Sequence, residues 1–234
     1  MKIKLLVAAA ATVLASSAMA QSAFEGFYGQ LGVGYENNSL SSRTLNVTTR
    51  PGEPDSGTAG AKVSAPTSSG GGFAGVIGLG YNVSVAPSFL VGIGADYAPT
   101  SVTTSTQNSI SCSSGCNLTN NYKISNRYNV FIAPGYELDK GKLVYIKGGF
   151  SSETVKWQSQ AGWGGASTIS QNANGYVVGL GYKQLIDKNI YVFGEGNYYS
   201  YSSNSVSGSS GSQTATQNQT PSAYQFLVGA GYKF

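Results

Sequence analysis

The fold is decided by the stretch Ala223-Tyr224-Gln225-Phe226-Leu227-Val228-Gly229-Ala230-Gly231-Tyr232-Lys233-Phe234. Its apolar side chains alternate with small or polar ones, and Leu227 is the single exception. Because successive side chains of a β-strand point to opposite faces, the pattern predicts a strand with one continuous apolar face. Soluble domains seldom end on their most hydrophobic strand, whereas the last strand of a closed barrel in lipid pairs with its first. The stretch therefore predicts a transmembrane β-barrel.

Seven earlier segments repeat the two-residue period. The repeated motif Gly-x-Gly-Tyr, as at Gly32–Tyr35 and Gly229–Tyr232, precedes no helical pattern, which argues against a nucleotide-binding glycine loop. The period predicts strands at 26–37, 71–83, 88–102, 122–138, 143–157, 172–185, 190–203 and 222–234. Short turns alternate with long polar connections near 38–70, 103–121, 158–171 and 204–221. We therefore expect an all-β, eight-stranded antiparallel up-and-down transmembrane β-barrel with short periplasmic turns and long extracellular loops. Its last strand should pair with the one that opens at Gly26.

Aromatic residues mark both ends of the predicted apolar face. They recur eight positions apart on five strands, as Phe27 and Tyr35, Phe73 and Tyr81, Phe89 and Tyr97, Tyr128 and Tyr136, and Tyr224 and Tyr232. At about 3.3 Å per residue and a tilt near 40°, this spacing covers about 20 Å of membrane depth. We expect aromatic girdles at the two membrane interfaces. A soluble β-sandwich, the alternative, gives no reason for the fixed separation.

Charged residues follow the opposite, inward face. The lumen of an eight-stranded barrel is just wide enough to be filled by side chains. A lysine such as Lys147 would cost about 2–4 kcal/mol on the lipid face at mid-membrane, so we expect it inside. The predicted lumenal charges are Lys123, Arg127, Lys147, Lys183 and Lys233 together with Glu36, Asp96, Glu137, Glu153 and Glu195. Equal numbers predict a mutually neutralising network, with Asp96 and Arg127 as its first ion pair. On the seventh strand, Glu195 should face inward together with Tyr191 and Phe193.

The first twenty residues have the pattern of a cleaved signal peptide. Lys2 and Lys4 flank an apolar stretch that is too short to span about 30 Å of hydrocarbon, and Ala18-Met19-Ala20 is an A-x-A cleavage site. We expect residues 1–20 to be removed and residues 21–234 to form the barrel. With no other apolar run of about 20 residues, the predicted location is the outer membrane of a Gram-negative bacterium.

The sequence predicts no metal or cofactor site and no nucleic-acid partner. Cys112 and Cys116 lie in Cys-Ser-Ser-Gly-Cys, and the chain has no histidine. A metal would need further ligands, whereas an oxidising compartment favours a local disulfide between the two cysteines. The formal net charge of +4 falls to +2 without Lys2 and Lys4, which is too small a surplus to indicate nucleic-acid binding.

Three segments resemble a known family. They are Gly26-Phe27-Tyr28-Gly29-Gln30-Leu31-Gly32-Val33-Gly34-Tyr35, Phe193-Gly194-Glu195-Gly196-Asn197-Tyr198 and the closing strand with its terminal Phe234. Over residues 24–234 the chain resembles the small eight-stranded outer-membrane barrels of the OmpA transmembrane domain, OmpX/Ail and opacity-protein type. The resemblance implies outer-membrane lipid and lipopolysaccharide as surroundings. It also implies Tyr232 and Phe234 as a signal for the barrel-assembly machinery.

The same resemblance implies a non-enzymatic surface protein with an envelope-structural or adhesive role. Its extracellular loops would meet a host or surface ligand, and Trp163 in Ala161-Gly162-Trp163-Gly164-Gly165 is a candidate contact. An aromatic residue folded onto the barrel rim is the alternative for Trp163. The alternative function is a small passive diffusion porin, which small inward residues favour and balanced lumenal charges oppose. Enzymatic barrels of this kind resemble one another in using histidine as the general acid or base. This chain has no histidine, so no catalytic residue is assigned.

Overall fold

A computed structural model describes residues 22–41, 43–49, 62–65, 67–104, 107–111, 117–161, 165–210 and 213–234. The strands that form the barrel are β1 (Gly26–Leu40), β4 (Ser68–Ala86), β5 (Phe89–Ala98), β8 (Asn117–Asp139), β9 (Lys142–Ala161), β10 (Gly165–Leu185), β11 (Ile190–Tyr201) and β14 (Pro221–Lys233). The remaining strands are β2 (Arg43–Thr49), β3 (Lys62–Ala65), β6 (Val102–Thr103), β7 (Gln107–Ser111), β12 (Asn204–Ser210) and β13 (Gln213–Gln219). Within these residues no helix is long and apolar enough to cross a membrane.

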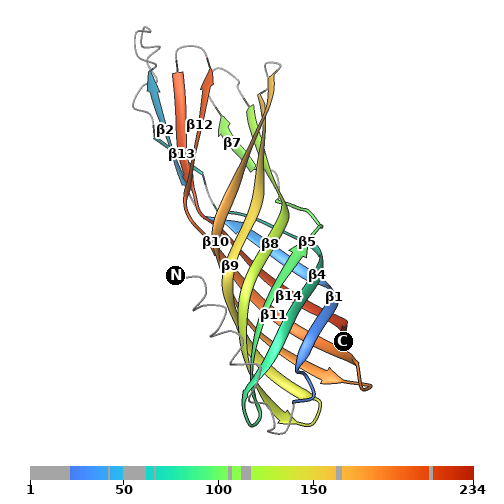
Figure 1. The fold of residues 1–234 in the computed structure, drawn as a ribbon. Coiled ribbons are helices and arrows are strands. Elements are labelled where there is room, and N and C mark those ends of the chain that lie inside the picture. The colour runs from blue at the N-terminus through green and yellow to red at the C-terminus, as the bar shows by residue number, and fades with distance from the viewer. Residues whose placement is uncertain are drawn as a thin grey trace, which may run out of the picture.

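Eight strands close into a ring of antiparallel neighbours, in the order β1–β4–β5–β8–β9–β10–β11–β14 and back to β1 (Figure 1). The closure was predicted from the terminal strand and is confirmed, because β14 pairs with β1 from Tyr28 opposite Lys233 to Leu40 opposite Pro221. All eight predicted strands are present, joined at one end by short turns such as 140–141 and 186–189. Ring closure leaves no unpaired sheet edge at membrane depth.

Large apolar side chains cover the outside of the ring. On β14 the Phe226 side chain is 66% exposed, whereas its neighbour Gln225 is 1% exposed and points inward. Leu227, the exception in the sequence pattern, also points inward and belongs to the same buried cluster as Phe193. The seventh predicted strand follows the expected parity, since Tyr191, Phe193 and Glu195 are all buried. An apolar exterior around a polar interior is the arrangement of a barrel in lipid.

The predicted girdle aromatics lie at two levels of this outer face. Near the short turns, the cross-strand pairs are Phe27–Tyr81 and Phe89–Tyr136. Near the opposite end, they are Tyr35–Phe73 and Tyr97–Tyr128. On the closing strand, Tyr232 lies at the turn end and Tyr224 at the other. Nine of the ten side chains are exposed, and Tyr81 is half-buried with its ring 4.7 Å from that of Phe27. Their arrangement suits membrane interfaces.

The long connections contain strands, which differs from the loops expected at these positions. β8, β9 and β10 continue beyond the barrel as a sheet that β7 extends (Figure 1). A second sheet, in the order β12–β13–β2–β3, lies at the same end. Serine and threonine in these segments accept extended backbone, and strand pairing satisfies the amide groups that polar loops would leave to water.

A β-bulge interrupts β8 and changes the facing of one predicted residue. The register against β9 shifts between Ser125 and Tyr128, and Asn126 has φ 54. The extra residue reverses the alternation, so Arg127 points inward while Lys123 is exposed. The prediction that Lys123 faces the lumen is therefore wrong. Regular alternation along β8 would place Lys123 on the same face as Arg127, and the bulge shifts this alternation by one position.

Candidate functional site

Two cationic centres organise the lumen at different heights. The lower one is Lys147 on β9, whose side chain is 1% exposed. Its Nζ donates to Oδ2 of Asp96 on β5 at 2.6 Å and to Oε1 of Glu195 on β11 at 3.0 Å. The ammonium also lies 4.2 Å from the ring centroid of Phe131. Because each partner is two strands away around the ring, Lys147 ties β5, β9 and β11 together from inside.

Neutral side chains complete the lower centre. Asn129 donates from Nδ2 to Oδ1 of Asp96. The Tyr145 hydroxyl donates to Oε2 of Glu195 at 2.5 Å, and Asn197 Nδ2 donates to Oε1 of Glu195 at 2.8 Å. Buried charges are tolerated only when they are paired and hydrogen-bonded in this way.

The upper centre is Arg127 on β8, whose guanidinium is shared among several strands. Its Nη1 donates to Oε2 of Glu36 on β1, and its Nη2 donates to Oε2 of Glu153 on β9 at 2.6 Å. Its Nε donates to the Tyr201 hydroxyl at 2.8 Å, and its Nη2 also donates to Oδ1 of Asn38 at 3.0 Å. The planar fork of arginine supplies this many donors at fixed angles.

The predicted Asp96–Arg127 ion pair is wrong, since each residue takes other partners. Arg127 stands opposite Ala98 in the β5–β8 register, and Asp96 stands opposite Asn129. Neighbouring strands therefore place the two charges at different heights. Inward side chains of a narrow barrel converge on its axis, so the ion pairs cross the lumen as well as joining adjacent strands.

Gln225 on β14 connects the two centres. Its Nε2 donates to Oε2 of Glu36 at 2.8 Å. Its Oε1 accepts from the Tyr199 hydroxyl at 2.9 Å and from Asn197 Nδ2 at 3.2 Å. The guanidinium of Arg127 lies 4.2 Å from the centroid of the Tyr199 ring. A continuous polar network thus extends from Glu36 down to Asp96 through charged and neutral members.

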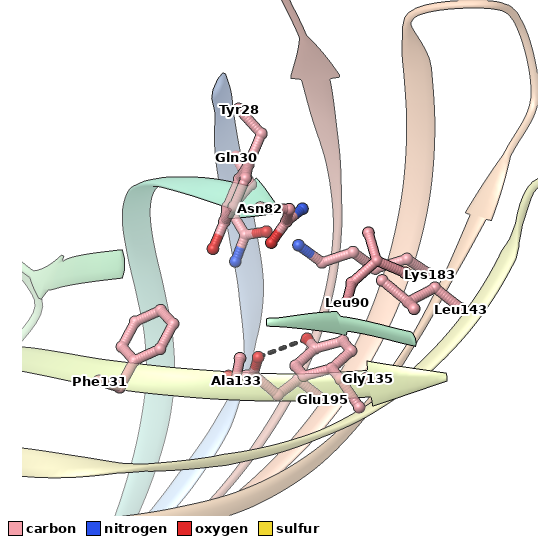
Figure 2. Close-up of a pocket in the computed structure, with 11 residues that line it drawn as sticks. Tyr28, Gln30, Asn82, Leu90, Phe131, Ala133, Gly135, Leu143, Lys183 and Glu195 are labelled. Carbon is pink, nitrogen blue, oxygen red and sulfur yellow. Dashed lines mark hydrogen bonds between the residues drawn. The ribbon is translucent and has the colours of Figure 1, made fainter. Parts of the chain in front are cut away.

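Lys183 is buried below this network without a carboxylate ion pair among the described residues. Its Nζ lies 3.9 Å from the ring centroid of Tyr28, 4.9 Å from that of Tyr191 and 5.3 Å from that of Tyr145. Cation–π attraction replaces the ion pair expected from the sequence. Figure 2 shows the ammonium pointing into the lumen toward Tyr28 and Asn82, beside a cavity of about 10 Å³. That volume is room for about one water molecule.

The segment 22–25 covers the mouth of the lumen at the end with short turns. Phe24 is buried, with its ring 6.3 Å from that of Tyr191. Asn82 Nδ2 donates to the Phe24 carbonyl at 2.9 Å, and Lys233 Nζ donates to the Ala23 carbonyl at 3.1 Å. Lys233 is therefore a tether for the N-terminal segment and not a member of the lumenal ion network.

Glu137 also lies outside the network to which the sequence assigned it. Its Oε1 accepts from the Gly141 amide at 3.4 Å in the turn that follows β8. A second register shift, between Glu137 and Asp139, ends regular pairing there. Of the ten predicted lumenal charges, six join the two centres, namely Arg127, Lys147, Glu36, Asp96, Glu153 and Glu195. The other four do not, because Lys183 lies among tyrosines, Glu137 stabilises a turn, Lys233 tethers the N-terminal segment and Lys123 is exposed.

Inward glycines make room for aromatic rings. A Cβ at Gly94 would lie 2.7 Å from Cζ of Phe131, and one at Gly229 would lie 2.6 Å from Cε1 of Phe193. Aromatic rings therefore occupy much of the space that these inward glycines leave. Tyr199, Tyr201, Asn129, Asn197 and Gln225 were not assigned to the network from the sequence. Their inward parity was the available signal.

Several predicted residues fall outside the described part of the chain. Cys112, Cys116, Trp163 and the signal segment 1–20 are among them. Within the described ranges, no group of three or more histidine, cysteine, aspartate or glutamate side chains is arranged to hold a metal ion.

Comparisons with known proteins agree with this architecture. Among solved structures, the chain is similar to the outer membrane protease OmpT from Escherichia coli, with 10% identity, a TM-score of 0.53, and coverage of 94% of this chain and 100% of that chain. It is similar to OprG from Pseudomonas aeruginosa, with 13% identity, a TM-score of 0.52, and coverage of 92% and 98%. Similarity to Ail, the attachment invasion locus protein of Yersinia pestis, has 14% identity, a TM-score of 0.39, and coverage of 90% and 99%.

The similarities to OmpT and OprG show a shared fold and no more. A comparison with curated protein sequences finds no match. The model of the outer membrane protein beta-barrel domain matches residues 6–234, which is nearly the whole chain. The chain therefore belongs to the outer membrane protein β-barrel domain family, and its place is the bacterial outer membrane.

Proposed function

We propose that this protein is a non-enzymatic outer-membrane surface protein, in which a closed barrel anchors an extracellular β-structure with an envelope-structural or adhesive role. The observation that carries the proposal is the buried network around Lys147 and Arg127. Four carboxylates and two cations, all nearly inaccessible to solvent, fill the lumen with ion pairs of 3.0 Å or less. A lumen filled in this way leaves the work of the protein to its extracellular face.

The extracellular strands supply that face. Strands β7, β8, β9 and β10 and the sheet β12–β13–β2–β3 extend the structure beyond one end of the barrel (Figure 1). Paired strands hold their shape better than single loops, so a partner meets a preorganised surface. Host or surface ligands are the proposed partners, with Trp163 as a proposed contact.

Biogenesis follows from the same proposal. Residues 1–20 would be cleaved as a signal, and residues 21–234 would then fold with Phe24 over the mouth. Phe234 and Tyr232 are exposed on the outer face of the closing strand, where an assembly machine could reach them. We propose these two side chains as the recognised signal.

Two other functions are less well supported. A passive diffusion porin needs a continuous water path, and the lumenal ion pairs and the segment 22–25 both oppose one. Protease activity is considered only because the fold is similar to that of the outer membrane protease OmpT. This chain has no histidine to act as a general base.

The adhesive role is tested by trimming the extracellular sheet. Residues 42–67 and 203–220 would each be replaced by a short Gly-Ser turn, which removes β2, β3, β12 and β13 and leaves the barrel strands. Cells that display equal amounts of intact and trimmed protein are compared for attachment to abiotic and host-matrix surfaces. We expect attachment to fall with the trimmed protein. Equal attachment, with both proteins folded at the surface, would contradict the adhesive role.

A further inference from the structure

Two lysines lie directly opposite each other on the outer face of the extracellular extension. Lys123 on β8 pairs in register with Lys156 on β9. Thr103 on β6 stands beside Lys123, and Ser170 on β10 stands beside Lys156. All four side chains are exposed. The result is a row across four strands in which two ammonium groups are flanked by two hydroxyl groups, here called the Lys123–Lys156 row.

Like charges directly opposite each other on neighbouring strands destabilise a sheet. No described carboxylate offsets them, because Glu36, Asp96, Glu153 and Glu195 lie in the lumen. The other described acidic residues are at the opposite end of the barrel, namely Glu25, Glu137, Asp139 and Asp187. The row therefore concentrates positive charge where the described protein supplies no counter-charge.

The position of the row relative to the membrane indicates where a counter-charge would come from. Ser152 pairs with Tyr128, the aromatic residue at the extracellular end of the apolar face, and Lys156 lies four residues farther along β9. At about 3.3 Å per residue and a tilt near 40°, the row stands about 10 Å beyond Tyr128. Long lysine side chains can bend back toward the membrane over that distance. Headgroups of the outer leaflet occupy this zone.

We infer that the Lys123–Lys156 row binds the phosphate group of an anionic lipid in the outer leaflet of the outer membrane. Two ammonium groups donate to the phosphate oxygens, and the hydroxyls of Thr103 and Ser170 supply weaker donors at either side. The chemistry is that of a phosphorylated glycolipid headgroup held against the barrel wall. The inference rests on the proposed orientation of the barrel and is independent of any adhesive role.

The test measures retention of lipid A by the purified, full-length mature barrel. Protein mixed with bisphosphorylated lipid A in detergent is passed through size exclusion, and the bound lipid is counted by native mass spectrometry. The variant Lys123→Gln/Lys156→Gln removes the two charges. The matched control Lys140→Gln/Lys142→Gln removes two exposed lysines from a periplasmic turn. Electrophoretic heat-modifiability confirms that each variant is folded.

We expect affinity for lipid A to fall about tenfold for each lysine removed from the row, as for a lost hydrogen bond to a charged group. The control variant and Lys123→Arg/Lys156→Arg should retain lipid A. Dephosphorylated lipid A should bind the wild-type protein and all variants with the same affinity. Equal retention by the row variant and the control would overturn the inference. So would competition by low concentrations of inorganic phosphate, which would indicate a site for the free ion. The adhesive role is tested separately by the attachment assays, so the lipid site and the adhesive role can each be disproved without the other.

Discussion

The Nζ of Lys147 lies 2.6 Å from Oδ2 of Asp96, in an ion pair that skips the intervening strand β8. Both side chains are almost completely inaccessible to solvent. The pair therefore acts as a brace across the lumen, and the barrel wall depends on charges that face its axis.

Replacing Lys147 with methionine should destabilise the barrel strongly. Asp96 and Glu195 would then be left as buried, unpaired carboxylates, which costs about 3–5 kcal/mol. The free energy of unfolding in urea, measured in lipid vesicles, would report the loss. The triple variant K147M/D96N/E195Q should recover much of it, because no unpaired charge then remains.

The exposed pair Lys142–Asp139 provides the comparison. Its atoms are 3.8 Å apart, with side chains 46% and 68% exposed. Lys142→Gln should change stability by less than about 1 kcal/mol. Equal costs for K147M and K142Q would mean that lumenal burial does not determine the strength of these pairs.

Arg127→Lys should also weaken the barrel, even though charge is conserved. Lysine cannot reproduce the donors that reach Glu36, Glu153 and Tyr201 together. Loss of one bond to a charged group costs about 1.5–3 kcal/mol. The same urea titration measures this cost, and wild-type stability for R127K would show that the fork geometry is dispensable.

A methyl group should be tolerated at Gly148 and not at Gly94. A Cβ at Gly94 meets Phe131, whose ring lies against Lys147, whereas nothing lies within 4 Å of one at Gly148. Gly94→Ala should therefore cost about 1–3 kcal/mol through overpacking. Gly148→Ala should be neutral or slightly stabilising. Equal stability of the two variants would place Phe131 elsewhere.

Asn126 should accept glycine and reject valine. Its φ of 54 lies in the left-handed region, where a β-branched residue is strained by about 1–2 kcal/mol. Comparing Asn126→Gly with Asn126→Val in thermal unfolding separates this strain from loss of the hydrogen bond from the Tyr97 hydroxyl to Asn126 Oδ1. A bulge that is absent in solution would give the two variants equal stability.

Sequence periodicity predicted the architecture because lipid on one side and a filled lumen on the other impose strict alternation. It identified the strands, the closure of β14 on β1, and the inward facing of Lys147 and Glu195. It did not identify the ion-pair partners. Arg127 reaches Glu36 across the lumen, and the order of residues in the sequence does not show which inward side chains meet there. It misplaced Lys123 because one extra residue at Asn126 reverses the alternation. The long connections were expected to be loops, because their residues are predominantly polar.

The central claim is that side chains close the lumen of the folded barrel. Single-channel recording of the purified, heat-modifiable protein in a planar lipid bilayer tests it most directly. A lumen occupied by the Lys147 and Arg127 networks predicts an unchanged baseline current across the applied voltage range. Stable, reproducible openings of wild-type protein would contradict a closed lumen and favour a diffusion pore.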